Sequence, residues 1–182
     1  EFLMDARVID IHPVARWFLI NFIIAPSRAP KSAKLYEKIW TKEGSPLLTH
    51  GLALKEKLQE KLGDKFLVAF GMRYQNPSLH SALEELRKAK VSKIIALPLY
   101  PQYASSSTGS TIEALMKEFG SWEVTPEVRI ISRFHDREEY LRAVLASAKE
   151  FNPADYDHVL FSFHGLPERH IKKSAEHYGD EK

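Results

Sequence analysis

The chain has 182 residues, of which 44% are hydrophobic and 27% are charged, the proportions of an ordinary soluble globular protein. Its formal net charge of only +2 gives no support for binding to nucleic acid. The absence of cysteine excludes disulfides, thiolate metal sites and thiol catalysis within these residues, and it fits a reducing compartment.

The strongest apolar run occupies residues 17–24. It is far shorter than the roughly 20 residues that a membrane-spanning helix needs, Asn21 interrupts it, and Arg16 and Arg28 flank it. We interpret the run as a helix of the core. An apolar lip on a ligand cleft, or a surface that touches a membrane, is the alternative. Loops are predicted nearby at 26–31 and 41–46, and helices at 31–40 and 47–62.

From residue 66 onward, short apolar runs alternate with helical patterns. The predicted strands are 66–70, 93–99, 128–131 and 157–163, and the predicted helices between them are 79–90, 112–119 and 136–148. Ser78 suits the N-cap of the first of these helices, and Gly120 ends the second. An alternation at spacings of roughly 30 residues is typical of βαβ units. The sequence therefore predicts an α/β fold with a doubly wound parallel sheet.

The segments that follow the predicted strands carry aromatic, cationic and imidazole side chains. In a parallel sheet these segments lie at one edge, outside the carboxyl ends of the strands, where ligands bind. The pattern suits a flat aromatic ligand with acidic substituents. The segments are residues 72–76, 100–105, 133–136 and 164–167.

His164 is the leading candidate for chemistry, because it follows the fourth predicted strand directly. A neutral imidazole near pH 7 can accept a proton or bind a divalent metal ion. A histidine that merely caps a strand or the next helix is the alternative. His170, seven residues before His177, lacks an acidic or histidine partner four residues further on, and we interpret both as surface histidines.

Arg28 and Lys31 can together hold carboxylates, the first through its planar fork and the second as a point charge. A solvated basic loop is an equally ordinary interpretation. The Ser/Thr cluster at 105–111 lacks the Gly-Lys-Ser/Thr core of a P-loop. Neither Gly-x-Ser-x-Gly nor Gly-x-Gly-x-x-Gly occurs, so the common hydrolase and dinucleotide-binding motifs are excluded.

Three segments together resemble the ferrochelatases, enzymes that insert ferrous iron into a porphyrin in haem synthesis. They are Leu-Pro-Leu-Tyr-Pro-Gln-Tyr at 97–103 with Ser-Ser-Thr-Gly-Ser at 106–110, Phe-Ser-Phe-His-Gly-Leu-Pro at 161–167, and Ser-Arg-Ala-Pro-Lys at 27–31 followed by Tyr36 and Gly-Ser-Pro at 44–46. Their order and spacing fit the family over nearly the whole chain. The resemblance implies two similar doubly wound lobes with the porphyrin in the cleft between them.

The resemblance also implies site residues. His164 matches the active-site histidine of the family, to which pyrrole proton abstraction, metal coordination or both are assigned. Arg28, Lys31 and Ser45 match positions that hold propionates, and Phe134 matches a pocket-wall position that is often Trp. The implied substrate contacts are Arg28, Lys31, Tyr36, Ser45, Arg73, Tyr74 and Phe134.

By the same resemblance, residues 1–125 represent the first lobe without its first strand, and 126–182 the start of the second, with the boundary near 121–126. The catalytic glutamate of the family would lie beyond Lys182, so we expect a fragment that is inactive alone. Ferrous iron and a porphyrin, protoporphyrin IX or coproporphyrin, are the expected substrates, and no tightly bound cofactor is expected. A cytoplasmic location, with peripheral membrane contact as a further option, is also expected. A related chelatase for cobalt or nickel, or a non-catalytic porphyrin- or haem-binding module, is the alternative.

Overall fold

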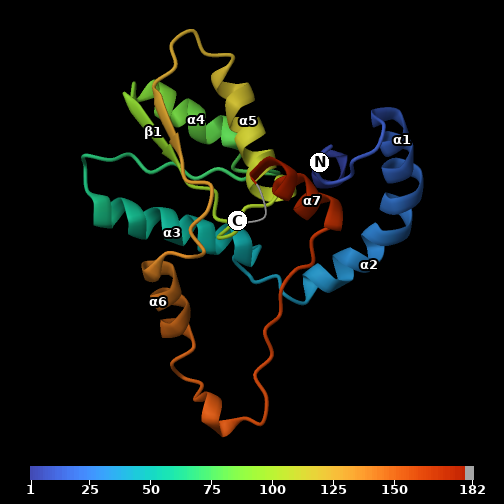
Figure 1. Ribbon diagram of the computed structural model, residues 1–182. Coiled ribbons are helices and arrows are strands. Elements are labelled where there is room, and N and C mark those ends of the chain that lie inside the picture. The colour runs from blue at the N-terminus through green and yellow to red at the C-terminus, as the bar shows by residue number, and fades with distance from the viewer. Residues whose placement is uncertain (179–182) are drawn as a thin grey trace. The chain divides into compact units, whose positions relative to one another are not determined.

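The computed structural model describes residues 1–178, except for the side chains of 174, 175, 177 and 178. Its residues form two compact units, Glu1–Ile94 with Ser110–Val128, and Ile95–Gly109 with the residues from Arg129 onward. The elements, shown in Figure 1, are η1 (Phe2–Met4), α1 (Pro13–Phe18), η2 (Leu19–Ile24), α2 (Ala25–Glu37), α3 (Pro46–Leu62), α4 (Leu79–Lys88), β1 (Lys93–Ala96), η3 (Ser105–Gly109), α5 (Ser110–Phe119), β2 (Glu127–Ile130), α6 (Glu138–Ser147), η4 (Pro153–Asp155) and α7 (Glu168–Tyr178).

The strands β1 and β2 pair in parallel. The Glu127 N–H donates to the Ser92 carbonyl at 3.1 Å, and the Ile131 N–H donates to the Ala96 carbonyl at 2.9 Å. Both partners therefore advance in the same direction along the chain, as parallel pairing requires. Since the connection between the strands contains α5, the three elements form a βαβ unit. The predicted α/β class is confirmed, and the doubly wound, two-lobe form stays a prediction.

The strand predicted at 66–70 does not form. A strand needs a neighbour that completes its hydrogen-bond ladder, and here a side chain takes the place of that neighbour. The Nε2 atom of Gln59 in α3 donates to the Phe66 carbonyl at 2.8 Å, and its Oε1 atom accepts from the Val68 N–H at 2.8 Å. Gly51 of α3 faces the Phe70 ring so closely that a Cβ atom would not fit. The segment therefore lies against α3 instead of joining the sheet.

The strand predicted at 157–163 does not form either. Its side chains are exposed, with Leu160 at 91% and both Phe161 and Phe163 at 77%. No segment within residues 1–178 pairs with it. A short apolar run is compatible with a buried strand, but the run itself cannot supply the partner that a strand requires.

The predicted loop at 26–31 is wrong, because α1, η2 and α2 follow one another without a break (Figure 1). A proline inside a helix lacks an N–H and crowds the carbonyl four residues earlier. Here the wide π turn η2 precedes Pro26, and the Ser27 hydroxyl donates to the Ile23 carbonyl in the same stretch. Pro30 lies inside α2. The helix thus continues through the prolines that were expected to end it.

The apolar run at 17–24 is helical but does not form the core. Ile20 is buried, whereas Trp17, Phe18 and Phe22 are 47%, 55% and 62% exposed. The three rings contact one another, with Phe18 and Phe22 stacked at 5.6 Å between centroids. Since a helix buries only the stripe that another element covers, these rings form an exposed aromatic surface. None of the helices in the described part of the chain is both long and apolar enough to cross a membrane.

The core of the first unit lies between α4, α5 and β1. The pattern predicted α4 well, and the Ser78 hydroxyl caps this helix by accepting from the Ser81 N–H at 3.1 Å. Each fully buried apolar side chain contributes about 1.5–3 kcal/mol, which holds α5 against α4. The start of α5 is thereby fixed close to the loop before α4. The buried side chains are Ala82, Leu83, Ile94, Leu115 and Phe119.

Candidate functional site

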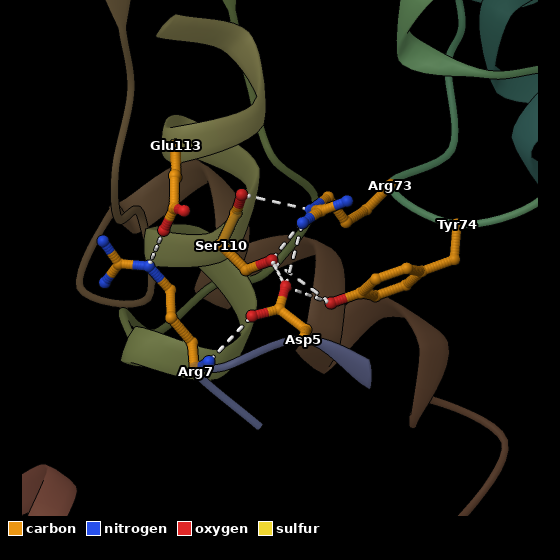
Figure 2. Close-up of polar contacts among 6 residues, drawn as sticks. All are labelled: Asp5, Arg7, Arg73, Tyr74, Ser110 and Glu113. Atoms are coloured by element: carbon orange, nitrogen blue, oxygen red, sulfur yellow. Dashed lines mark hydrogen bonds and ion pairs between the residues drawn. The ribbon is translucent and has the colours of Figure 1, made fainter. Parts of the chain in front are cut away.

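Side chains from three distant parts of the first unit meet at one carboxylate (Figure 2). Asp5 precedes α1, Arg73 and Tyr74 lie in the loop before α4, and Ser110 begins α5. The Oδ2 atom of Asp5 accepts from Arg73 Nη2 at 2.9 Å, from the Tyr74 hydroxyl at 2.8 Å and from the Ser110 hydroxyl at 2.5 Å. The Arg7 backbone N–H donates to Oδ1 at 2.8 Å. We call Asp5, Arg73, Tyr74 and Ser110 the Asp5 network.

Further contacts within the Asp5 network fix the Arg73 side chain. Its Nε atom donates to the Ser110 hydroxyl oxygen at 2.8 Å and to the Ser110 carbonyl at 3.1 Å. Its guanidinium carbon lies 4.5 Å from the centroid of the Tyr74 ring, within the range of a cation–π contact. The Phe2 ring meets the Tyr74 ring edge-on at 5.4 Å. Tyr74 is thus held at its hydroxyl and on its ring.

These contacts shift the pKa values of two groups in opposite directions. Burial by itself raises the pKa of the Asp5 carboxyl, but hydrogen bonds from Ser110, the Arg7 backbone and Tyr74, together with the Arg73 charge, outweigh it and leave the pKa below its ordinary value. Burial, reinforced by the neighbouring carboxylate, raises the pKa of the Tyr74 hydroxyl. Near neutral pH, Asp5 is therefore a carboxylate and Tyr74 is a neutral phenol that donates to it.

Two cavities lie beside the Asp5 network within the first unit. The larger has a volume of about 650 Å³ and places Tyr74 among mainly apolar residues of the N-terminal segment, η2 and α2. The smaller has a volume of about 260 Å³, is mainly polar, and has Arg73 in its wall. A cavity with apolar walls and a few fixed polar groups is the usual form of a small-molecule site. The residues around the larger cavity are Glu1, Phe2, Leu3, Met4, Ile20, Ala25, Tyr74, Gln75 and Asn76.

His80 and Glu118 form an ion pair in the wall of the smaller cavity. The His80 Nδ1 atom lies 2.9 Å from Glu118 Oε2, and the hydrogen bond and charge of Glu118 raise the pKa of the imidazole above its ordinary value of 6.5. Because the pKa is raised in the folded state, the contribution of the pair to stability is complete below the unfolded-state pKa. It is lost as the pH rises through the folded-state pKa.

We therefore expect His80 to titrate above 6.5 in the folded protein, and Glu118→Gln to lower its pKa toward that value. The imidazole shifts, followed by NMR across the pH range, measure both quantities. Glu85→Gln is the matched control, because Glu85 lies on the same helix as His80 and pairs with Lys55 instead. A His80 pKa that does not respond to Glu118→Gln would contradict the contact.

The predicted propionate contacts lie on and after α2. Arg28 and Lys31 are three residues apart in this helix, so their side chains are neighbours on its surface. Neither cation has an ion-pair partner among residues 1–178, and both are exposed. Tyr36, further along α2, is 58% exposed. Ser45 is the N-cap residue of α3, and its side chain makes no capping bond.

The two remaining predicted residues belong to the second unit. Phe134 is fixed there, because its N–H donates to the Pro101 carbonyl at 2.9 Å and its ring meets Tyr140 of α6 edge-on at 5.3 Å. His164 lies in the irregular segment before α7 and is exposed. The prediction that a strand holds His164 is wrong, because residues 157–163 pair with no other segment among residues 1–178.

The interpretation of His170 as a surface histidine is also wrong. It lies in the first turn of α7 and is 8% exposed, so this side of the helix is covered. The side chain of His177 lies outside the described residues. Within the part of the chain that the structure describes, no group of three or more His, Cys, Asp or Glu side chains could hold a metal ion.

Sequence reasoning identified Arg73 and Tyr74 but missed Asp5 and the role of Ser110. Ser110 lies in the Ser/Thr cluster at 105–111, which gave a weak signal. Asp5 gave none, because its partners Arg73 and Ser110 are 68 and 105 residues away. Of the predicted substrate contacts, the structure brings Arg73 together with Tyr74 and places Arg28 beside Lys31.

Comparisons with known proteins identify relatives of the chain. A model of the ferrochelatase family matches residues 1–182. A curated ferrochelatase from Legionella pneumophila (strain Paris) is 46% identical over 175 residues, which are 96% of this chain and 52% of the relative. One from Coxiella burnetii (strain RSA 493 / Nine Mile phase I) is 43% identical over 179 residues, which are 96% of this chain and 49% of the relative. The chain thus spans about half the length of the curated relatives it matches.

Proposed function

The chain belongs to the ferrochelatase family, and we propose that the protein containing it inserts ferrous iron into a porphyrin in haem synthesis. The observation that carries this proposal is the match of the family model to all 182 residues. In this proposal residues 1–125 belong to the first chelatase lobe and 126–182 to the second, with the boundary in the irregular stretch at 121–126. The chain alone is inactive in this proposal, because the catalytic glutamate that the resemblance implies would lie in the part of the second lobe that the chain does not span.

The substrate in this proposal is protoporphyrin IX or coproporphyrin. The paired cations Arg28 and Lys31 support the choice of a carboxylate-bearing ligand, since neither is engaged elsewhere in the described chain. In this proposal Arg28 and Lys31 bind the propionates and Ser45 adds a further contact to them, which keeps the ring in register for reaction. Tyr36, Tyr74 and Phe134 supply aromatic contacts to the flat macrocycle, with Arg73 next to Tyr74.

His164 accepts a proton and contacts the metal in this proposal. Two pyrrole N–H protons leave as the divalent ion enters, so that the metalloporphyrin carries no extra charge. In this proposal the imidazole takes one of them and the second passes to water. A neutral imidazole near pH 7 is a suitable acceptor, and the exposure of His164 leaves it accessible to substrate. An apolar slot that distorts the ring exposes the nitrogen lone pairs, with the strain supplied by binding energy.

Iron is the second substrate, and the proposal requires no tightly bound cofactor and no nucleic acid. It places the protein in the cytoplasm with peripheral contact to a membrane. The support for this contact is the exposed aromatic surface of Trp17, Phe18 and Phe22, which suits the boundary between lipid headgroups and acyl chains.

Anaerobic incubation of the complete protein with ferrous iron and protoporphyrin IX tests the proposal, with loss of porphyrin fluorescence as the readout. We expect turnover by the complete protein and none by the 182-residue chain alone. Cobalt and nickel are tested in parallel, because a preference for either would identify a related chelatase. Binding of porphyrin without insertion of any of the three metals would replace the proposal with a porphyrin-binding module.

A further inference from the structure

We infer that Asp5 is a positioning residue, which holds the Tyr74 ring in the wall of the larger cavity where the porphyrin binds. This inference rests on the proposed function, because it assigns the aromatic contact of that reaction. The observation behind it is the convergence of Arg73, Tyr74 and Ser110 on one oxygen of Asp5 (Figure 2).

The Asp5 carboxylate is largely buried, and both of its oxygens accept hydrogen bonds. Its side chain is 9% exposed, Oδ2 accepts three hydrogen bonds, and Oδ1 accepts a fourth from the Arg7 backbone. A largely buried carboxylate that loses these donors is left with an uncompensated charge, so the loss of any one donor is costly. The lowered pKa of Asp5 is consistent with this, since it keeps the acceptor charged throughout the neutral range.

Arg73 is committed to Asp5 and is therefore unlike Arg28 and Lys31. Its Nη2 atom lies 2.9 Å from the Asp5 carboxylate, and its Nε atom is engaged by Ser110. A guanidinium whose charge is matched within the protein offers little to a propionate. Its remaining contact is the face of the Tyr74 ring at 4.5 Å. Arg73 thus acts on the substrate through Tyr74.

Tyr74 presents its ring to the cavity. Its hydroxyl is occupied by Asp5 at 2.8 Å and lies 3.2 Å from the Ser110 hydroxyl, so its polar end points into the Asp5 network. Arg73 contacts the ring, and Phe2 meets it edge-on. Tyr74 is among the residues that line the cavity of about 650 Å³, and in this inference its ring is the part exposed to the ligand. A ring fixed in this way can stack on a flat aromatic ligand without losing rotamer freedom when the ligand binds.

If Asp5 had a purely structural role, it would make the same hydrogen bonds, but its replacement would have different consequences. The stability of the fold would fall, and the affinity of the folded molecules for porphyrin would not change. Loss of a positioning residue weakens porphyrin binding in molecules that remain folded. The weakening also disappears when the Tyr74 ring is already absent, because the effect passes through that ring.

Asp5→Asn in the complete protein separates these two roles. We expect the Kd for protoporphyrin IX, measured by Soret absorbance, and the KM to rise about tenfold while kcat changes less than about threefold. In a Tyr74→Ala background, Asp5→Asn should cause no further rise in Kd. Glu113→Gln is the matched control, because the Arg7–Glu113 ion pair also joins the N-terminal segment to α5 without touching Tyr74. We expect its Kd to equal that of the wild type.

Thermal unfolding of each variant identifies the folded fraction. If Asp5→Asn does not fold, the same measurements are made on Tyr74→Phe. This variant removes the hydroxyl that donates to Asp5 and keeps the Asp5–Arg73 ion pair. The inference would be overturned if the folded Asp5→Asn or Tyr74→Phe variant had the Kd of the wild type. It would also be overturned if the effect of Asp5→Asn on Kd were additive with that of Tyr74→Ala. Either result would leave the proposed function standing. A wild type that neither binds nor metallates porphyrin would overturn the proposed function, and the inference with it.

Discussion

Replacing His164 with alanine in the complete protein is expected to lower kcat for ferrous insertion by about a thousandfold. A positioned general base contributes about 10²–10⁴ to a rate, and here the same imidazole would also contact the metal ion. In the proposed function other residues bind the porphyrin, so its Kd should change little. Anaerobic initial rates at saturating porphyrin and iron measure kcat, and Soret titration without metal measures Kd.

His158→Ala is the matched control for this prediction. His158 is an exposed histidine in the same irregular segment as His164 and has no role in the proposed mechanism. Its replacement should leave kcat within about twofold of the wild type, as expected for a surface substitution. A His164→Ala protein that is as active as His158→Ala would refute the assignment of His164 as proton acceptor and metal contact.

Local signals in the sequence predicted the helices around the site. Ser78 caps α4 as expected, because a cap depends on residues within one turn of each other. The same is true of the apolar stripe that packs α5, with Leu115 and Phe119 buried. Periodicity and capping are properties of neighbouring residues, so one sequence is sufficient to read them.

Features that depend on distant partners could not be predicted in the same way. The run at 66–70 has the composition of a strand, but Gln59 supplies the hydrogen bonds that a strand would have supplied. The run at 157–163 has no partner in the described chain and stays irregular. At 26–31, the local signal of two prolines was overridden by the continuity of α1, η2 and α2. At 66–70 the deciding contact lay outside the window that a strand pattern covers.

In the candidate site, too, residues with a local signal could be predicted and a residue that depends on distant partners could not. Arg28 and Lys31 could be predicted because two cations lie three residues apart in the sequence, and Arg73 and Tyr74 because the family resemblance implies them. Asp5 could not be found, because no local pattern distinguishes it from any other aspartate. Its importance lies in three side chains that the fold brings to one carboxylate oxygen. Motifs therefore predict residues of the candidate site, and the fold shows how Arg73 and Tyr74 are held.

Simultaneous replacement of Arg28 and Lys31 by alanine is expected to raise the KM for protoporphyrin IX about a hundredfold, with kcat nearly unchanged. Hydrogen bonds to charged groups contribute about 1.5–3 kcal/mol, and the exposure of both cations favours the lower end, about tenfold for each. The contacts to the propionates are the same in the ground state and the transition state, so their loss appears in KM. Steady-state kinetics at fixed low ionic strength provide the measurement, because salt screens exposed charges.

The dimethyl ester of protoporphyrin IX makes this prediction specific to the carboxylates. The ester keeps the aromatic ring and removes both negative charges, so the wild type should bind it about as weakly as the double variant binds the acid. The double variant should barely distinguish acid from ester. Lys34→Ala removes the next lysine along α2 and should leave both affinities unchanged, since Lys34 is not one of the proposed propionate contacts. Equal affinity of the wild type for acid and ester would mean that Arg28 and Lys31 hold no propionate, whatever the variants do to KM.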